Sequence, residues 1–181
     1  ILFAGRLTPD KGSHQMLAAL HDVVRDVPDA LLLMLTRASL AEQGLDAPQY
    51  QALLPHLKIG GWMQGRELAA AYHAADVVAV PSVCFDTFPT VNLEAMAAAK
   101  PVIATCFGGA REAVQDGISA FIVNPFDTAT FANRLKRVLT DATLAAQMGA
   151  AGYQRAVTHF SLARFVADME QVYHDAIARR R

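Results

Sequence analysis

Cysteine is scarce in this chain of 181 residues, which holds only Cys84 and Cys106. The two lie too far apart for a redox pair and lack the companion ligands of a metal site, so we expect reduced core thiols in a cytoplasmic protein. The six histidines are scattered without metal-ligand spacing, and no Asp-x-Asp pair occurs. The sequence therefore predicts neither a resident metal nor a disulfide framework.

The chain also has almost no net charge and no long apolar run. Sixteen basic residues nearly balance seventeen acidic ones, which argues against a field that would draw the chain to nucleic acid or anionic lipid. No apolar run reaches the roughly 18 residues of a membrane span, and no signal peptide opens the chain. Hydrophobic residues make up 53% and charged ones 18%, a composition that excludes disorder and predicts an apolar face covered by a partner.

No methionine precedes Ile1-Leu2-Phe3-Ala4, which run straight into an expected strand. We interpret this start as that of a fragment cut at a domain boundary. The length suits one globular domain with a sizeable core, or one domain followed by a terminal helix.

Short apolar runs alternate with amphipathic stretches along the chain. The runs are bounded by turn residues and too short for typical helices, so we expect six strands, each buried on both faces. Their ranges are 1–5, 30–35, 57–60, 76–80, 101–105 and 120–123. Helical spacing lies between them, including a stretch that follows a predicted N-cap at Asp127. From Leu144 onward the pattern is helical, and the last helix carries an apolar stripe at Phe165, Met169, Val172 and Tyr173.

This alternation predicts an α/β fold: a Rossmann-like, doubly wound, parallel six-stranded sheet with C-terminal helices. If the strand order is 3-2-1-4-5-6, the loops after strands one and four diverge and leave a ligand crevice between them. The first loop places two cations, Arg6 and Lys11, before a helix. The other leads through Pro89 into a helix that contains Glu94.

An anion would suit this crevice. The backbone N–H groups of Thr90, Val91 and Asn92 are expected to lack intrahelical acceptors and to point at a diphosphate, which Arg6 and Lys11 would also contact. Glu94, one turn in, could accept hydrogen bonds from paired sugar hydroxyls. The simpler alternatives are that the two cations are surface charges and that Glu94 only favours the helix dipole.

Three motifs carry a resemblance to a known family: G-R-L-x-x-x-K-G from Gly5, F-D-T-F-P-T-V-N-L-E-A-M-A from Phe85, and K-P-V-I-A-T-C-F-G-G-A-R-E-A-V-Q-D-G from Lys100. Over nearly the whole chain they resemble the family 4, or group 1, glycosyltransferases of GT-B fold. The family's pair of acids keeps its spacing here from Asp86 to Glu94, with Asp replacing the usual Glu. Two departures are Pro89, where many relatives have Gly, and the turn from Thr36 to Ser39, which is not Gly-rich.

The resemblance implies roles for particular residues. Arg6 and Lys11 would hold the donor diphosphate, Glu94 the ribose hydroxyls and Asp86 the donor sugar, whereas Asp86 could otherwise only cap a turn. The remaining contacts would come from backbone: Phe88, Pro89, Thr90 and Val91 at the sugar or phosphate, Gly60 and Gly61 before Trp62 near the base, and Gly109 at the sugar pocket.

The resemblance also implies a function, namely the C-terminal donor-binding half of a retaining hexosyltransferase in carbohydrate biosynthesis. Residues 1–158 would bind a nucleotide-diphosphate sugar without metal or other cofactor, and residues 159–181 would form a helix that crosses toward an absent N-terminal domain. That domain would bind the acceptor, a glycan, lipid or small molecule, in the cytoplasm or at the inner face of the membrane. The fragment alone would bind the donor weakly and transfer nothing. The base, whether uracil, guanine or adenine, stays open.

Other functions remain as alternatives. A GT-B epimerase handles the same nucleotide sugars, but we find no acid and base residues suited to the anomeric and adjacent carbons. A non-catalytic nucleotide-binding module differs only in its partner domain. A dinucleotide oxidoreductase is disfavoured because the first loop lacks G-x-G-x-x-G and no acid follows the second strand at the usual spacing.

Overall fold

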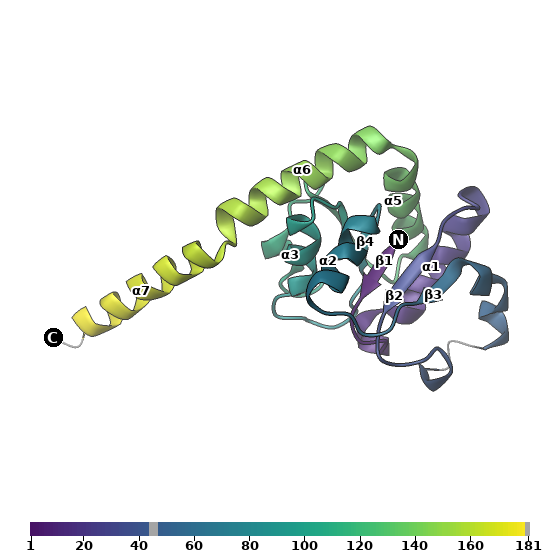
Figure 1. The fold of residues 1–181 in the computed structure, drawn as a ribbon, viewed down its shortest axis with the longest axis horizontal. Coiled ribbons are helices and arrows are strands. Elements are labelled where there is room, and N and C mark those ends of the chain that lie inside the picture. Colours follow the sequence, from purple (N-terminus) through teal and green to yellow (C-terminus); the bar gives the residue numbers. More distant parts are fainter. Residues whose placement is uncertain (44–46, 180–181) are drawn as a thin grey trace.

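The computed structural model describes residues 1–43 and 47–179, which form an α/β domain followed by a projecting helix (Figure 1). Its centre is a six-stranded, wholly parallel sheet in the order β3-β2-β1-β4-β5-β6. The strands are β1 Leu2–Ala4, β2 Leu32–Leu35, β3 Leu57–Ile59, β4 Val78–Val80, β5 Val102–Thr105 and β6 Ala120–Val123. The six expected strands and their order are therefore confirmed.

Helices cover both faces of the sheet. They are α1 Ser13–Asp26, α2 Gly65–Ala74, α3 Thr90–Ala97, α4 Ala110–Ala113, α5 Thr128–Thr140, α6 Ala142–His159 and α7 Leu162–Ala178, with 3-10 turns at Pro9–Lys11, Ala41–Gln43 and Pro48–His56. Successive strand residues point to opposite faces. Phe3 thus joins the core beneath α1 and α5, whereas Leu2 joins the core beneath α2, α3 and α4.

Strand β3 departs from the expectation that every strand is buried on both faces. Leu57 is half-buried, and Lys58 and Ile59 are exposed. The cause is position in the sheet, because β3 is an edge strand that pairs only with β2. An exposed lysine on such an edge also discourages pairing with a second chain.

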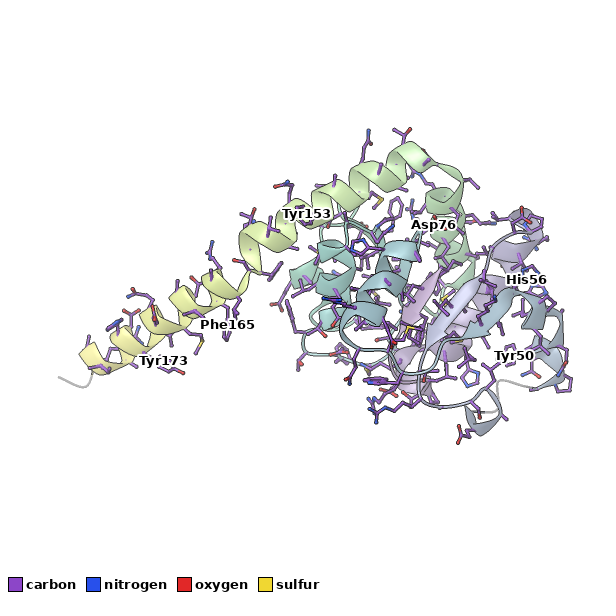
Figure 2. The ribbon with its side chains drawn as sticks, in the orientation of Figure 1. Tyr50, His56, Asp76, Tyr153, Phe165 and Tyr173 are labelled. Carbon is purple, nitrogen blue, oxygen red and sulfur yellow. The ribbon has the colours of Figure 1, made fainter. Side chains whose placement is uncertain are left out.

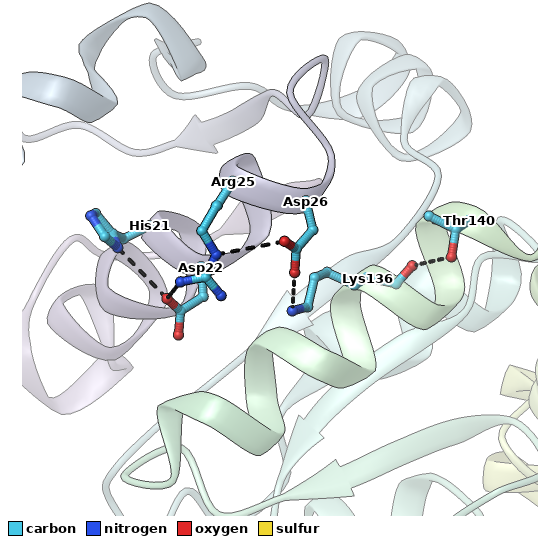
Figure 3. A network of polar contacts seen from close by, with 6 residues as sticks. All are labelled: His21, Asp22, Arg25, Asp26, Lys136 and Thr140. Atoms are coloured by element: carbon cyan, nitrogen blue, oxygen red, sulfur yellow. Dashed lines mark hydrogen bonds and ion pairs between the residues drawn. The ribbon is translucent and has the colours of Figure 1, made fainter.

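Side-chain caps and ion pairs fix the helices around the sheet. The predicted N-cap at Asp127 is confirmed, because its Oδ1 accepts a hydrogen bond from the Thr130 backbone N–H at 3.0 Å. The α1 and α5 helices pack side by side and are joined by Lys136, whose Nζ lies 2.6 Å from Asp26 Oδ2 (Figure 3). These contacts hold one helical layer together at a distance from the ligand crevice.

The last two helices leave the domain in one direction. The α6 helix packs on α3, and after Phe160 and Ser161 the chain continues as α7, which extends away from the body and has no buried residue (Figure 1). The predicted stripe lies on this helix, with Phe165 and Tyr173 exposed (Figure 2). Of the terminal arginines, Arg180 and Arg181 lie outside the described residues.

Candidate donor site

The loops after β1 and β4 enclose a hollow of about 190 Å³ at the carboxyl edge of the sheet. Gly5 and Lys11 line it from the first loop, and Asp86 and the segment Phe88–Val91 line it from the second. Neighbouring strands whose connections leave in opposite directions create a ligand crevice at this point. The hollow therefore lies where the strand order predicts a site.

Backbone contacts hold the loop after β1 against the loop after β4. A Cβ built on Gly12 would lie 1.9 Å from the Pro81 carbonyl oxygen, and Gly12 has a left-handed φ of +76°. Only glycine fits such an approach in that conformation. The amide N–H of Val83 also donates to the Asp10 carbonyl at 2.9 Å. The two loops consequently form one continuous wall.

The two predicted cations lie in different surroundings. Lys11 Nζ contacts Asp86 Oδ2 at 2.5 Å, and both side chains are about three-quarters buried. Arg6 is 69% exposed, and its Nη2 lies 3.4 Å from Asp10 Oδ2. The structure thus brings Lys11 and Asp86 together inside the hollow and leaves the Arg6 guanidinium on the surface beside it.

The α3 helix begins at this hollow. Pro89 is its N-cap residue, with φ of −72°, so the amides of Thr90 and Val91 open the helix without a preceding turn to supply acceptors. The expectation was wrong for the amide of Asn92, which donates to the Pro89 carbonyl at 3.0 Å. The first turn of α3 is tight, because the carbonyl of the N-cap residue Pro89 accepts the Asn92 N–H. An anion in the hollow would therefore meet two amides of this helix rather than three.

Glu94 lies one turn further along α3 and lines a second hollow of about 240 Å³. Gly5, Thr90 and Val91 line both hollows, so the two adjoin. Glu94 Oε2 accepts a hydrogen bond from the Tyr72 hydroxyl at 2.5 Å. Burial and this hydrogen bond raise the pKa of Tyr72 far above its ordinary value.

The far end of the second hollow is formed by the turn after β3. Gly60 donates its N–H to the Met34 carbonyl at 2.9 Å, Gly61 has φ of +72°, and Trp62 then lines the hollow. Trp62 is 49% exposed, and the guanidinium carbon of Arg37 lies 4.6 Å from its ring centroid. A cation over an aromatic face at this distance is attractive.

Gly109 supports the β4 loop from behind. A Cβ on Gly109 would lie 1.9 Å from the Thr87 carbonyl oxygen, and the Gly109 amide donates to the Asp86 carbonyl at 2.8 Å. Gly109 is buried under the loop and is not among the residues that line either hollow. Its position in the structure is that of a support for Asp86.

Tyr72 and Arg37 were missed as site residues by reasoning from the sequence. The spacing of Tyr72 in the sequence is that of a core residue on the apolar side of a helix, and its partner Glu94 is 22 residues away. Arg37 was noted only as part of an unusual turn. No local pattern links either residue to its partner.

Within residues 1–43 and 47–179, no group of three or more His, Cys, Asp or Glu side chains could hold a metal ion. Metal independence stays a prediction. In the same part of the chain, no helix has the length and apolarity needed to cross a membrane. Cys84 and Cys106 are free and half-buried, so they are not the core thiols that the sequence predicted, because both lie on loops that follow strands.

Comparison with known proteins shows which protein family this chain resembles. The family described as Glycosyl transferases group 1 matches residues 1–155. The D-inositol 3-phosphate glycosyltransferase of Salinispora tropica is 43% identical over 117 residues, which are 65% of this chain and 24% of that protein. The glycogen synthase of Mycobacterium tuberculosis is 31% identical over 173 residues, 96% of this chain and 42% of that protein. The chain thus spans less than half the length of these relatives.

Solved structures agree with the sequence comparison. The sucrose-phosphate synthase of Thermosynechococcus elongatus superposes with a TM-score of 0.86 and 28% identity, over 98% of this chain and 45% of that one. The structural neighbours are glycosyltransferases of GT-B fold, which confirms the predicted fold class. The chain belongs to the group 1 glycosyl transferases.

Proposed function

We propose that this domain binds a nucleotide-diphosphate sugar and forms the donor half of a retaining hexosyltransferase. The observation that carries the proposal is the pair of adjoining hollows, which share Gly5, Thr90 and Val91 and have Lys11 in one and Glu94 in the other. In a nucleoside diphosphate the diphosphate is bonded directly to the ribose, so the two groups would occupy adjoining hollows. The known group 1 relatives and GT-B neighbours support the same assignment.

In this proposal the diphosphate occupies the first hollow. Lys11 and the amides of Thr90 and Val91 face it, and Arg6 swings in from the surface beside Gly5. As the bond to the sugar breaks, negative charge grows on the leaving diphosphate, and fixed positive groups stabilise that charge more than the ground state. Lysine, arginine and a helix N-terminus supply the charge here, so the transfer needs no metal ion.

The nucleoside would extend into the second hollow. Glu94 accepts hydrogen bonds from the ribose hydroxyls, and the base lies near Gly60, Gly61 and Trp62. The sugar lies at the other end, beside Asp86, on the loop that Gly109 supports. UDP and UDP-glucose are present in solved complexes of the Anabaena protein HepE, whose fold superposes on this chain with TM-scores of 0.85 and 0.84 at 23% identity. That likeness makes UDP the first ligand to test.

The acceptor would be bound by a domain outside this chain. Residues 1–158 would be the donor domain, and residues 159–181 would reach the acceptor domain through the exposed apolar stripe of α7. The acceptor would be a glycan, lipid or small molecule, with the enzyme in the cytoplasm or at the inner face of the membrane. The chain alone would bind the donor and transfer no sugar.

Calorimetric titration with UDP, GDP and ADP, in magnesium and in EDTA, tests the donor site. We expect one diphosphate to bind equally in both buffers, and Arg6→Ala and Glu94→Ala to weaken binding about tenfold or more. Arg25→Ala and Glu170→Ala are matched controls, since each removes the same kind of side chain far from the hollows. Binding that needs magnesium, or that survives both site variants, would contradict the proposal.

A further inference from the structure

Glu94 stands between two hollows of the surface. One is the nucleoside hollow of about 240 Å³, which it lines together with Trp62 and Val91. The other, of about 430 Å³, lies between α2 and α3 and is lined mainly by small and apolar residues. Its lining is Gly65, Leu68, Ala69, Tyr72, His73, Glu94, Ala97 and Ala98. A glutamate with rotatable side-chain bonds at this position has two directions in which its carboxylate can point.

Tyr72 selects one arrangement of that carboxylate. It lies near the end of α2, is 3% exposed, and belongs to the core cluster that also contains Ala95 and Met96 of α3. Its ring is therefore fixed by packing on the helix that carries Glu94. From this fixed position the hydroxyl donates to Glu94 Oε2 at 2.5 Å. The contact joins α2 to α3 at the hollow of about 430 Å³, which both side chains line, and of the two only Glu94 also lines the nucleoside hollow.

Tyr72 and Glu94 have complementary hydrogen-bonding groups, a hydroxyl donor and a carboxylate acceptor. A tyrosine hydroxyl can donate one proton, and an ionised carboxylate can only accept. The raised pKa of Tyr72 keeps its proton in place over the whole neutral range. A carboxylate has room for about four hydrogen bonds on its two oxygens, so the bond to Tyr72 leaves Oε1 and part of Oε2 available to a ligand.

We propose that Tyr72 is a positioning residue, which fixes the Glu94 carboxylate at the border of the nucleoside hollow and so makes the site select ribonucleotides over 2′-deoxy and 3′-deoxy nucleotides. The inference rests on the proposed function, in which Glu94 receives the ribose hydroxyls. A carboxylate already fixed in its binding orientation loses little freedom when the ligand arrives. Two adjacent hydroxyls can then bind it together, and a sugar that lacks one of them leaves an acceptor unpaired.

Tyr72→Phe is the informative variant because it keeps the buried ring and removes only the hydroxyl. Calorimetry would compare whichever of UDP, GDP and ADP binds the wild type with its 2′-deoxy and 3′-deoxy forms. We expect the wild type to favour the ribonucleotide about tenfold or more. In Tyr72→Phe, affinity for the ribonucleotide falls about tenfold while affinity for the deoxy forms stays nearly constant, so the preference disappears.

Two further variants separate positioning from simple stability. Tyr50→Phe removes the other partly buried tyrosine hydroxyl with a known partner, His14 Nδ1 at 3.0 Å, and should leave the preference intact. In a Glu94→Ala background, Tyr72→Phe should have no additional effect on ribonucleotide affinity, because the group it positions is gone. Glu94→Asp, too short to keep both contacts, should mimic Tyr72→Phe.

The outcomes are distinct. If the wild type binds none of the three diphosphates, the proposed function fails. If it binds and Tyr72→Phe keeps the wild-type preference for ribose, or weakens ribo and deoxy forms equally, the donor site stands and the role of Tyr72 is overturned. Circular dichroism of Tyr72→Phe confirms that the comparison is made on folded protein, and Tyr72→Met, which also fills the core and lacks the hydroxyl, supplies the answer if that variant does not fold.

Discussion

Lys11 and Asp86 join the two loops that form the first hollow, with Nζ and Oδ2 2.5 Å apart although the residues are 75 positions apart in the chain. Each is charged, and each is also the residue assigned to a different part of the donor. In the proposed complex Lys11 would therefore divide its three donors between Asp86 and the phosphate oxygens. Asp86 both orients the lysine and competes with the ligand for it.

Asp86→Asn should consequently raise affinity for a diphosphate that lacks the sugar. Removing the carboxylate charge frees Lys11 and abolishes repulsion of phosphate, and we expect UDP to bind several-fold more tightly. Lys11→Ala should weaken the same binding about tenfold, or about 1.4 kcal/mol. Titration with UDP measures both, and Asp168→Asn, which removes a similar ion pair on α7, is the control. Weaker UDP binding in Asp86→Asn would refute the competition.

Trp62 is the single tryptophan of the chain and lines the second hollow, where we propose that the base binds. Its fluorescence should change when a nucleoside diphosphate binds and stay unchanged with inorganic pyrophosphate, which lacks the base. Arg37→Ala should shift the emission of the free protein, because the guanidinium above the ring is lost. It should also weaken nucleotide binding but not pyrophosphate binding. An identical response to both ligands would place the base elsewhere.

Ala99 is a non-glycine residue in left-handed conformation, with φ of +54°, and it follows Ala98, the C-cap residue of α3. A side chain costs about 1 kcal/mol in this region, whereas glycine adopts it readily. We expect Ala99→Gly to stabilise the domain by roughly 0.5–1 kcal/mol in urea denaturation. Ala97→Gly, two residues earlier in ordinary helix, is the matched control and should destabilise by a similar amount. Destabilisation by both would show that Ala99 bears no strain.

The Asp127 cap predicts a pH dependence. Hydrogen bonds from Thr130 lower the pKa of the Asp127 carboxyl below its ordinary value. The stability it contributes is thus complete above that ordinary pKa and is lost as the pH falls through the lowered one. Asp127→Asn can still cap the helix but does not ionise. Urea midpoints from pH 7 down to pH 2 should fall less steeply in this variant, and parallel curves would exclude the cap as a source.

Much of the fold could be predicted because it depends on local pattern. Buried runs such as Val102–Thr105 mark a parallel strand by themselves, and an aspartate before a helical stripe marks a cap. The exposure of Lys58 on β3 depended instead on which strand lies at the edge, which only the assembled sheet determines.

Part of the candidate site could likewise be predicted from the sequence, and part could not. The loops that carry Lys11 and Glu94 could be located from strand order and motif, because parallel strands bring their carboxyl ends together. The contacts made by those side chains could not be predicted. Tyr72 reaches Glu94 only because α2 and α3 cover the same face of the sheet, and the Asn92 amide is used by a tight turn at Pro89 that residue identity does not reveal.

The close backbone contacts of Gly12 with Pro81 and of Gly109 with Thr87 have an evolutionary consequence. These main-chain contacts help to set the path of the loop after β4, so part of its shape does not depend on which side chains the loop carries. Exposed positions such as Phe85 and Thr87 can therefore diversify while the anion-binding end keeps its shape. If the proposed donor site is right, a scaffold of this kind can acquire a preference for a different sugar through a few surface substitutions, while the backbone around the first hollow stays unchanged.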